Sequence, residues 1–224
     1  MTQIDYLIIN DMTKLGNLVV GKKNVITIMG ILNISPESFY KNSIKSTKSQ
    51  ISKYLSDMEE NGANIIDIGG MSTAPYLKTI VSEKIESERI TKTIKIIQDL
   101  SNIPISVDTC RAKVAKDALD MGIDVINDIS GLKYDKNMSK VVEKYNPSLI
   151  LCSYSNRAVK GNPISITKQL LNESVKIAEC AQISKNKIVL DPAIGFFRRP
   201  SDVKNNLPYT KITSDWVQRD VEII

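Results

Sequence analysis

The sequence predicts an α/β fold, a TIM-type (β/α)8 barrel of which this chain contains about six βα units. Short apolar, β-branched runs alternate with longer stretches whose apolar residues follow a helical period, as expected for buried strands each followed by an amphipathic helix. Nearly every predicted strand also runs into a polar or glycine-rich cluster, which is typical of a barrel because its βα loops meet at one end. The alternative, a doubly wound sheet, would concentrate its signal in one GxGxxG turn, and the sequence has none.

The first predicted element is a β-hairpin with strands at Tyr6–Ile9 and Leu18–Val20 and a turn region that contains Gly16. We therefore divide the chain into an N-terminal hairpin extension, residues 1–23, and a barrel domain, residues 24–224. The six strands expected in the barrel are Val25–Met29, Asn64–Ile68, Ile105–Val107, Val125–Ile126, Leu149–Leu151 and Ile188–Leu190.

Four apolar faces with helical spacing predict the helices between these strands, and a shorter helix is expected from Asn137 to Lys144. The faces are Ile51, Leu55 and Met58; Ile90, Ile94 and Ile97; Val114, Ala115, Ala118 and Leu119; and Leu170, Leu171, Ser174, Val175 and Ala178. Because a closed barrel needs eight strands, we expect the chain to lack the last two and to be part of a longer protein.

The 224 residues include no histidine, which excludes Ser-His-Asp and Cys-His nucleophiles, HExxH zinc sites and histidine general bases. Chemistry must therefore use carboxylates, amides, hydroxyls, Lys or Arg. The three cysteines, Cys110, Cys152 and Cys180, form no CxxC pair and are expected to be reduced core residues.

The net charge of +5 comes mainly from lysines interleaved with acidic residues, which indicates a solvated surface. Because arginine is scarce and aromatic residues make up 5% of the chain, we expect no nucleic-acid partner. The sequence contains no signal peptide and no apolar run of membrane-spanning length, so we expect a cytoplasmic protein without a membrane partner.

Polar residues at the ends of the predicted strands are the first candidates for a site. Each could simply cap the helix that follows, but repetition on four strands favours a pocket for a flat heterocycle that presents N–H groups. Asp108 and Asp191 are the sharpest candidates, because each directly ends an apolar run. The complete set is Asn33, Asp67, Asp108, Asn127, Asp128 and Asp191.

Three further segments could bind anions or a metal, although each is also compatible with an ordinary surface loop. The segment GGMST, residues 69–73, offers backbone N–H groups and hydroxyls, and NISPESF, residues 33–39, offers oxygen ligands for Mg²⁺. Arg198 and Arg199 follow the sixth strand and could neutralise a phosphate or carboxylate. Cys110 lies at a helix start but has no acid or base partner in sequence.

Taken together, the motifs resemble those of the dihydropteroate synthase family of pterin-binding barrels. The matching segments, which span most of the chain in the family's order, are IMGILNISPESF (28–39), GANIIDIGGMSTAP (62–75), ISVDT (105–109), VINDISG (125–131) and IVLDPAIGF (188–196). The segments GGMSTAPY and DPAIGFFR are more similar to the archaeal branch of the family than to the common bacterial pattern.

The resemblance implies a transferase that condenses 6-hydroxymethyl-7,8-dihydropterin pyrophosphate with para-aminobenzoate or a related arylamine, for folate or pterin biosynthesis. It implies that Asp108, Asn127 and Asp191 are the catalytic residues that hold the pterin ring, and that Thr73 and Phe197 also bind substrate. It further implies Mg²⁺ as cofactor with Asn33 as its ligand, and a homodimer.

Several positions depart from the bacterial family pattern. Ala74 replaces an arginine, Glu37 replaces an aspartate, and the fifth strand ends in Cys152-Ser153-Tyr154 instead of Met-His-Met. Loss of the arginine removes a phosphate contact. Two alternatives therefore stay open, a pterin-dependent methyltransferase of the same barrel family and a pterin-binding paralogue without catalytic activity.

Overall fold

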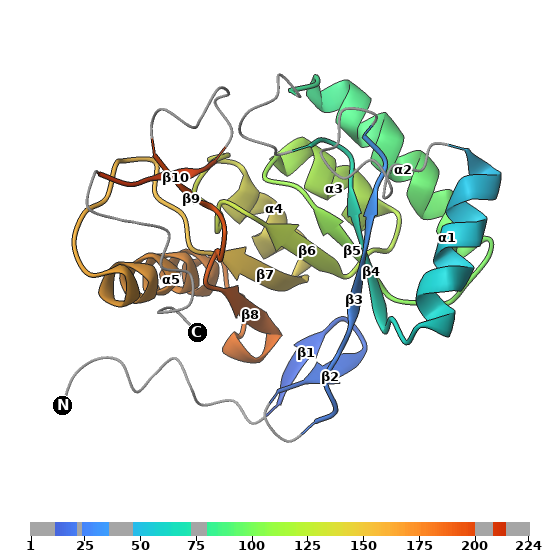
Figure 1. Ribbon diagram of the computed structural model, residues 1–224, viewed down its shortest axis with the longest axis horizontal. Coiled ribbons are helices and arrows are strands. Elements are labelled where there is room, and N and C mark those ends of the chain that lie inside the picture. The colour runs from blue at the N-terminus through green and yellow to red at the C-terminus, as the bar shows by residue number, and fades with distance from the viewer. Residues whose placement is uncertain (1–11, 22–23, 36–46, 73–79, 200–207, 214–224) are drawn as a thin grey trace.

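A computed structural model describes residues 12–21, 24–35, 47–72, 80–199 and 208–213 of the chain. Its centre is a parallel sheet with strand order β3-β4-β5-β6-β7-β8, so that strands follow one another in space as they do in sequence (Figure 1). The strands are β3 (Met29–Asn33), β4 (Ile65–Gly69), β5 (Ile105–Asp108), β6 (Val125–Asp128), β7 (Ser148–Cys152) and β8 (Ile188–Asp191). The prediction of about six βα units is thereby confirmed for the described residues.

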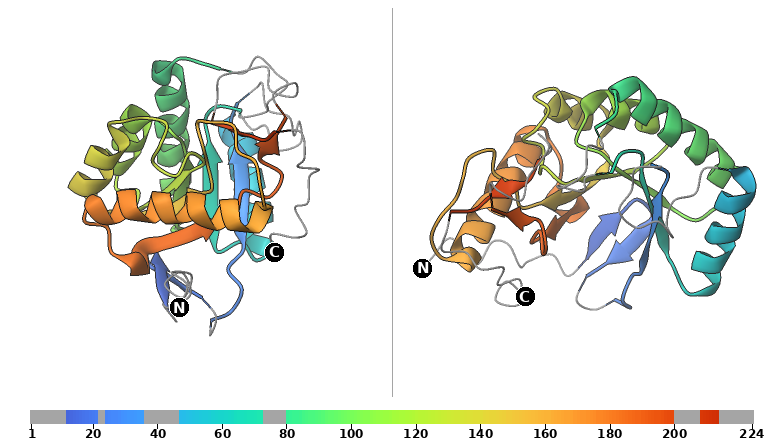
Figure 2. Two further views of the ribbon diagram at one scale, coloured as in Figure 1. Left: turned by 90° about the vertical axis from the view of Figure 1, so that its left-hand side faces the viewer. Right: turned by 45° about the horizontal axis from the view of Figure 1, so that its top comes forward.

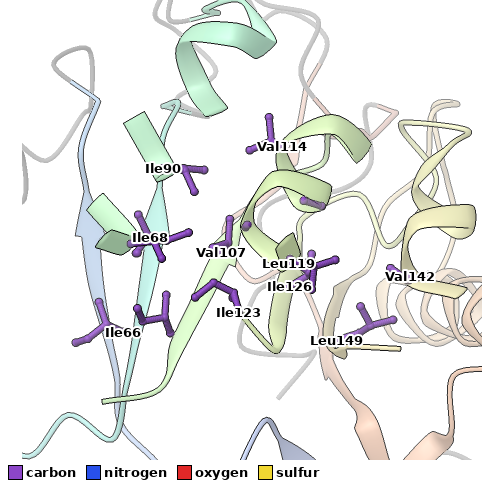
Figure 3. Close-up of a cluster of buried hydrophobic side chains, with 14 of the residues drawn as sticks. Ile66, Ile68, Ile90, Val107, Val114, Leu119, Ile123, Ile126, Val142 and Leu149 are labelled. Carbon is purple, nitrogen blue, oxygen red and sulfur yellow. The ribbon is translucent and has the colours of Figure 1, made fainter. Parts of the chain in front are cut away.

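Five helices connect these strands and pack on one side of the sheet (Figure 2). Each contributes buried residues to the cluster that the outward-facing strand residues form, among them Ile66, Val107, Ile126 and Leu149 (Figure 3). A doubly wound sheet would have helices on both faces, so this arrangement favours the barrel prediction. The helices are α1 (Lys48–Glu60), α2 (Glu83–Gln98), α3 (Ala112–Asp120), α4 (Met138–Tyr145) and α5 (Pro163–Cys180).

The helices begin where the sequence supplies caps. Thr47 and Gln50 form a capping box at the start of α1, and the side chains of Ser82 and Asn162 accept hydrogen bonds from the first turns of α2 and α5. The predicted apolar faces point to the sheet; Met58 and Val175 are only partly buried. A short 3-10 turn, η3 (Lys185–Lys187), precedes β8.

The N-terminal hairpin consists of β1 (Thr13–Leu15) and β2 (Leu18–Val20), with Gly16 in its turn at φ +60°. The second strand was predicted correctly, whereas the expected partner Tyr6–Ile9 lies outside the described residues. Leu15 packs against residues at the amino-terminal ends of the barrel strands, and the backbone N–H of Gly16 donates to Oγ of Ser148 at 3.0 Å. The hairpin therefore covers the amino end of the sheet.

Two expectations about apolar residues were wrong. The first barrel strand runs from Met29 to Asn33 and not from Val25 to Met29, and Val25 and Ile26 are 90% and 85% exposed. Pairing of β3 with β4 decides which part of the apolar run becomes the strand. Cys180 is exposed because it lies two positions beyond Ala178, off the helix face that contacts the core.

A second, smaller parallel pair lies beyond the carboxyl ends of the strands. It is formed by β9 (Phe197–Arg198) and β10 (Thr210–Lys211), and a bridge between Val159 and Ile212 extends it. The ring of Phe196 stacks on that of Tyr209 with centroids 6.0 Å apart. These segments build a layer of loops over the end of the sheet near β7 and β8 (Figure 1).

Candidate active site

The inner face of the sheet carries a row of polar positions at its carboxyl end. Asn33 is in register with Gly69, Gly69 with Asp108, and Asp108 with Asn127, across four neighbouring strands. Residues paired in register project from the same face of a parallel sheet, so the three side chains lie side by side. The structure thus brings together three of the residues singled out in the sequence.

Gly69 keeps the space between Asn33 and Asp108 open. A Cβ atom at this position would lie 2.9 Å from Oδ1 of Asn33 and 3.6 Å from Oδ2 of Asp108. Any side chain here would fill the gap between the amide and the carboxyl group. The glycine that appeared in the sequence as part of an anion cradle therefore leaves room beside both polar groups.

Burial and charge together shape the electrostatics of this row. Desolvation raises the pKa of Asp108 well above its usual value, and the neighbouring negative charges of Asp67, Glu86, Asp128 and Asp191 raise it further. A carboxyl group in this setting favours partners that donate hydrogen bonds or carry positive charge. The same setting disfavours a lone anion.

Asp67 is a buried carboxyl group on β4, two residues before Gly69. Oδ2 of Asp67 accepts a hydrogen bond from Nδ2 of Asn127 at 3.0 Å, and Asp67 is 4% exposed. Burial raises its pKa above the usual value. The hydroxyl of its register partner Ser106 and the amide of Asn127 lie beside the carboxyl group and partly offset that rise.

Asp191 ends β8 and lies in register with Cys152, two strands from Asn127. Its Oδ1 accepts a hydrogen bond from the backbone N–H of Ala193 at 2.8 Å, which stabilises the turn where Ala193 has a φ of +64°. Its charge acts on Asp108, so the two carboxyl groups share one electrostatic environment. The carboxyl end of the sheet thus carries hydrogen-bond acceptors from Asn33 on β3, at one edge, to Asp191 on β8, at the other edge.

The other predicted site residues lie elsewhere. Thr73 and Ala74 are outside the described residues, as is Glu37. Phe197 is 3% exposed and packs with core residues such as Leu170 and Ile212, whereas its partly buried neighbour Phe196 stacks on Tyr209. Nη1 of Arg198 donates to the backbone oxygen of Phe197, and Arg199 follows it in the chain.

The side chain of Asp128 forms hydrogen bonds within the loop that follows β6. Its Oδ1 accepts hydrogen bonds from the backbone N–H and the hydroxyl of Ser130, and its Oδ2 accepts one from the N–H of Leu132 at 3.0 Å. The side chain is fully buried, and desolvation raises its pKa to about 6. Asp128 therefore stabilises the turn that follows β6 and does not cap helix α4, whose N-cap is Asn137.

A buried ion pair between Arg111 and Glu86, which was not expected from the sequence, supports the loops around the site. Nη1 of Arg111 lies 2.7 Å from Oε2 of Glu86, and Oε1 of Glu86 accepts from the hydroxyl of Thr109 at 2.7 Å. Arg111 also donates to the backbone oxygen of Val81 at 2.9 Å. The pair ties helix α2 to the segment that follows Asp108, and its only signal in the sequence is an arginine close behind the SVDT motif.

The cysteines near the site do not form a reactive thiolate. Cys110 and Cys152 are 2% exposed, and desolvation followed by nearby carboxylates raises both thiol pKa values well above the usual value. No disulfide bond joins the three cysteines. The described residues also contain no cluster of three acidic or cysteine side chains that could bind a metal by themselves.

Comparisons with known proteins agree on one family. A family profile described as "Pterin binding enzyme" matches residues 29–213. The chain is 40% identical to the dihydropteroate synthase of Clostridium beijerinckii over 188 residues, which cover 82% of this chain and 69% of that protein. It is 38% identical to the dihydropteroate synthase of Bacillus subtilis, with coverage of 78% and 61%.

Solved structures give the same result. The dihydropteroate synthase of Clostridium difficile, crystallised in the presence of pteroic acid, has a TM-score of 0.67 and 36% identity, covering 76% of this chain and 65% of that one. The Yersinia pestis enzyme in a sulfonamide complex has a TM-score of 0.73 and 26% identity, with coverage of 83% and 68%. The chain therefore spans between three fifths and seven tenths of the length of these relatives.

Proposed function

Because this chain belongs to the dihydropteroate synthase family of pterin binding enzymes, we propose that it takes part in the condensation of 6-hydroxymethyl-7,8-dihydropterin diphosphate with para-aminobenzoate. In this transfer the C–O bond between the pterin methylene and the diphosphate breaks, and a C–N bond to the amine forms. The amine gives up one proton, and dihydropteroate and diphosphate are the products. The observation that carries the proposal is the row of Asn33, Asp108 and Asn127 around the space left by Gly69.

Asp108, Asn127 and Asp191 would bind the pterin ring. A dihydropterin presents an amino group and ring N–H groups along one edge, and carboxylate and amide oxygens are matching acceptors. Binding would also place carboxylates beside the ring as positive charge develops at the methylene carbon. Electrostatic stabilisation of this kind requires no general base, in keeping with a chain that has no histidine.

We propose Mg²⁺ as the cofactor, with Asn33 as a protein ligand. Mg²⁺ commonly takes one or two protein oxygens and completes its shell with substrate phosphates and water, and Oδ1 of Asn33 lies at the edge of the space left by Gly69. The ion would neutralise the diphosphate and help it to leave. Thr73 and the arginines Arg198 and Arg199 would contact the anionic groups, and Phe197 would support the arylamine pocket.

We further propose that the protein works as a homodimer in the cytoplasm with small molecules as its substrates. None of the helices in the described part of the chain has the length and apolarity needed to cross a membrane. Sedimentation of the purified protein at several concentrations would test the dimer. A single species of monomer mass at all concentrations would contradict it.

Release of diphosphate that depends on para-aminobenzoate is the test of the proposed reaction. We expect release with both substrates and Mg²⁺, and none when either substrate or the metal is omitted. Binding of the pterin without release would instead favour the non-catalytic pterin-binding alternative. Failure to bind a pterin would overturn both the proposed reaction and the non-catalytic alternative.

A further inference from the structure

We propose that Asp67 is a positioning residue that fixes the orientation of the Asn127 side-chain amide and thereby decides which atom meets the ligand. This inference rests on the proposed pterin site. The juxtaposition that carries it is a single contact, in which Nδ2 of Asn127 donates to Oδ2 of Asp67 at 3.0 Å. Asp67 lies on β4, two residues before Gly69, and is 4% exposed.

The contact determines the direction of the amide. An asparagine side chain presents an oxygen acceptor on one side and an NH₂ donor on the other, and the two can exchange by a half rotation. An ionised carboxylate at Asp67 can only accept, so it takes the NH₂ group, whereas the opposite orientation would place two oxygens against each other. The Asn127 amide therefore keeps its nitrogen toward Asp67, and its oxygen is left as the atom to meet the ligand.

Burial makes this preference strong. Asp67 is 4% exposed, and the side-chain amide of Asn127 donates to its Oδ2. An unpaired buried acceptor is costly, and an interaction in a medium of low dielectric constant is stronger than in water. Asp67 thus holds a ligand-binding amide in place without touching the ligand itself.

The consequence is specificity for a ring edge that donates hydrogen bonds. An Asn127 oxygen accepts from an amino or ring N–H group, as a pterin has, and meets a ring carbonyl unfavourably. Lumazine has the same ring system as a pterin but carries an oxygen in place of the 2-amino group. We therefore expect the protein to bind a pterin more tightly than lumazine, and we expect Asp67 to be one cause of that preference.

The test measures the Kd of 6-hydroxymethylpterin and of lumazine by fluorescence titration of the full chain. In Asp67→Asn, the new amide can act as donor or acceptor, so Asn127 can turn. We expect pterin binding to weaken about tenfold and the preference for pterin over lumazine to fall by a similar factor. Asp99→Asn, the same change at an exposed carboxyl group, should leave both values as in the parent.

A double exchange separates positioning from simple structural support. In the Asp67→Asn and Asn127→Asp double variant, the new amide at position 67 donates to the new carboxylate at position 127. The other carboxylate oxygen at position 127 then faces the ligand. The total charge is also unchanged. We expect this variant to recover most of the pterin preference that Asp67→Asn loses.

Three results would overturn the inference. They are an unchanged pterin preference in folded Asp67→Asn, an equal loss in Asp99→Asn, and a folded double variant that is no better than Asp67→Asn. If Asp67→Asn does not fold, the preference measured in the double variant decides alone. Absence of pterin binding in the parent chain would contradict the proposed function instead, so the two failures are distinguishable.

Discussion

The two ends of the inner face of the sheet are built from the same strands and have opposite chemistry. At the amino end, Ile65, Val125 and Ile150 pack against Leu15 of the hairpin. Two residues further along the same strands, Asp67 follows Ile65 and Asn127 follows Val125. Since residues two apart in a strand face the same way, the change from apolar to polar runs along the inner face and not between its two faces.

One end of the sheet stabilises the fold, and the polar groups at the other end lower its stability. Carboxyl groups with raised pKa values, such as Asp67 and Asp108, destabilise the folded chain when they ionise. The apolar amino end and the helices on the outer face supply the burial that offsets them. Variants at the two ends should therefore separate stability from binding.

The largest effect is expected at the ion pair that supports the polar end. Glu86→Ala leaves the guanidinium of Arg111, whose side chain is 9% exposed, without its counter-ion. Removing one partner of a buried pair typically destabilises by about 3 to 5 kcal/mol. Urea unfolding measures this loss. Glu88→Ala, at an exposed position of the same helix, is the control and should change stability by less than about 0.5 kcal/mol.

A smaller loss of stability is expected at the amino end. Leu15→Ala removes a side chain that is 5% exposed and packs on Ile65 and Val125, so we expect a loss of about 2 to 3 kcal/mol in urea unfolding. The matched change Val19→Ala, at a 42% exposed position of the same hairpin, should have little effect. Equal effects of the two variants would show that the hairpin does not cover the sheet.

The opposite pattern is expected at Asp108. Asp108→Asn replaces a charged acceptor with a neutral amide, and hydrogen bonds to charged groups contribute about 1.5 to 3 kcal/mol. We expect kcat/KM for diphosphate release to fall by about tenfold to a hundredfold, while the fold is retained. A variant as active as the parent would exclude Asp108 from the substrate site.

The smallest effect concerns the pH dependence of stability. The folded-state pKa of Asp108 is raised, so the stability linked to its proton is complete below the unfolded value of about 3.9 and is lost as the pH rises through the folded value. Asp108→Asn cannot titrate, so its stability should decline less than that of the parent as the pH rises above about 3.9. Asp99→Asn, at an exposed carboxyl group, is the control. Parallel pH profiles for Asp108→Asn and the parent would contradict the raised pKa.

Much of this arrangement was predictable because it depends on local patterns. The β-branched runs located five of the six barrel strands, and Asp108, Asn127 and Asp191, which we propose bind the pterin, stand at the ends of those strands as expected. The position of the first strand was not predictable, because apolar residues before Met29 look like those within it and only pairing with β4 distinguishes them.

Contacts between distant residues were not predictable from the sequence. Glu86 lies on a helix with several other acidic residues, and nothing local marks it as the partner of Arg111, 25 positions away. The contact between Asp67 and Asn127 joins two strands that are separated by β5, so it depends on the curvature of the sheet. Such pairs become visible only when the strands are placed in three dimensions.

The division of the inner face into a binding end and a stabilising end is tested most directly by calorimetric titration with 6-hydroxymethyl-7,8-dihydropterin diphosphate and Mg²⁺. The titration compares the parent chain, Leu15→Ala and Asp108→Asn under conditions in which all three are folded. If the polar end binds the pterin and the apolar end only stabilises the fold, the parent and Leu15→Ala will have the same Kd, and Asp108→Asn will bind at least about tenfold more weakly. An unchanged Kd in Asp108→Asn, or a weakened one in Leu15→Ala, would contradict this division.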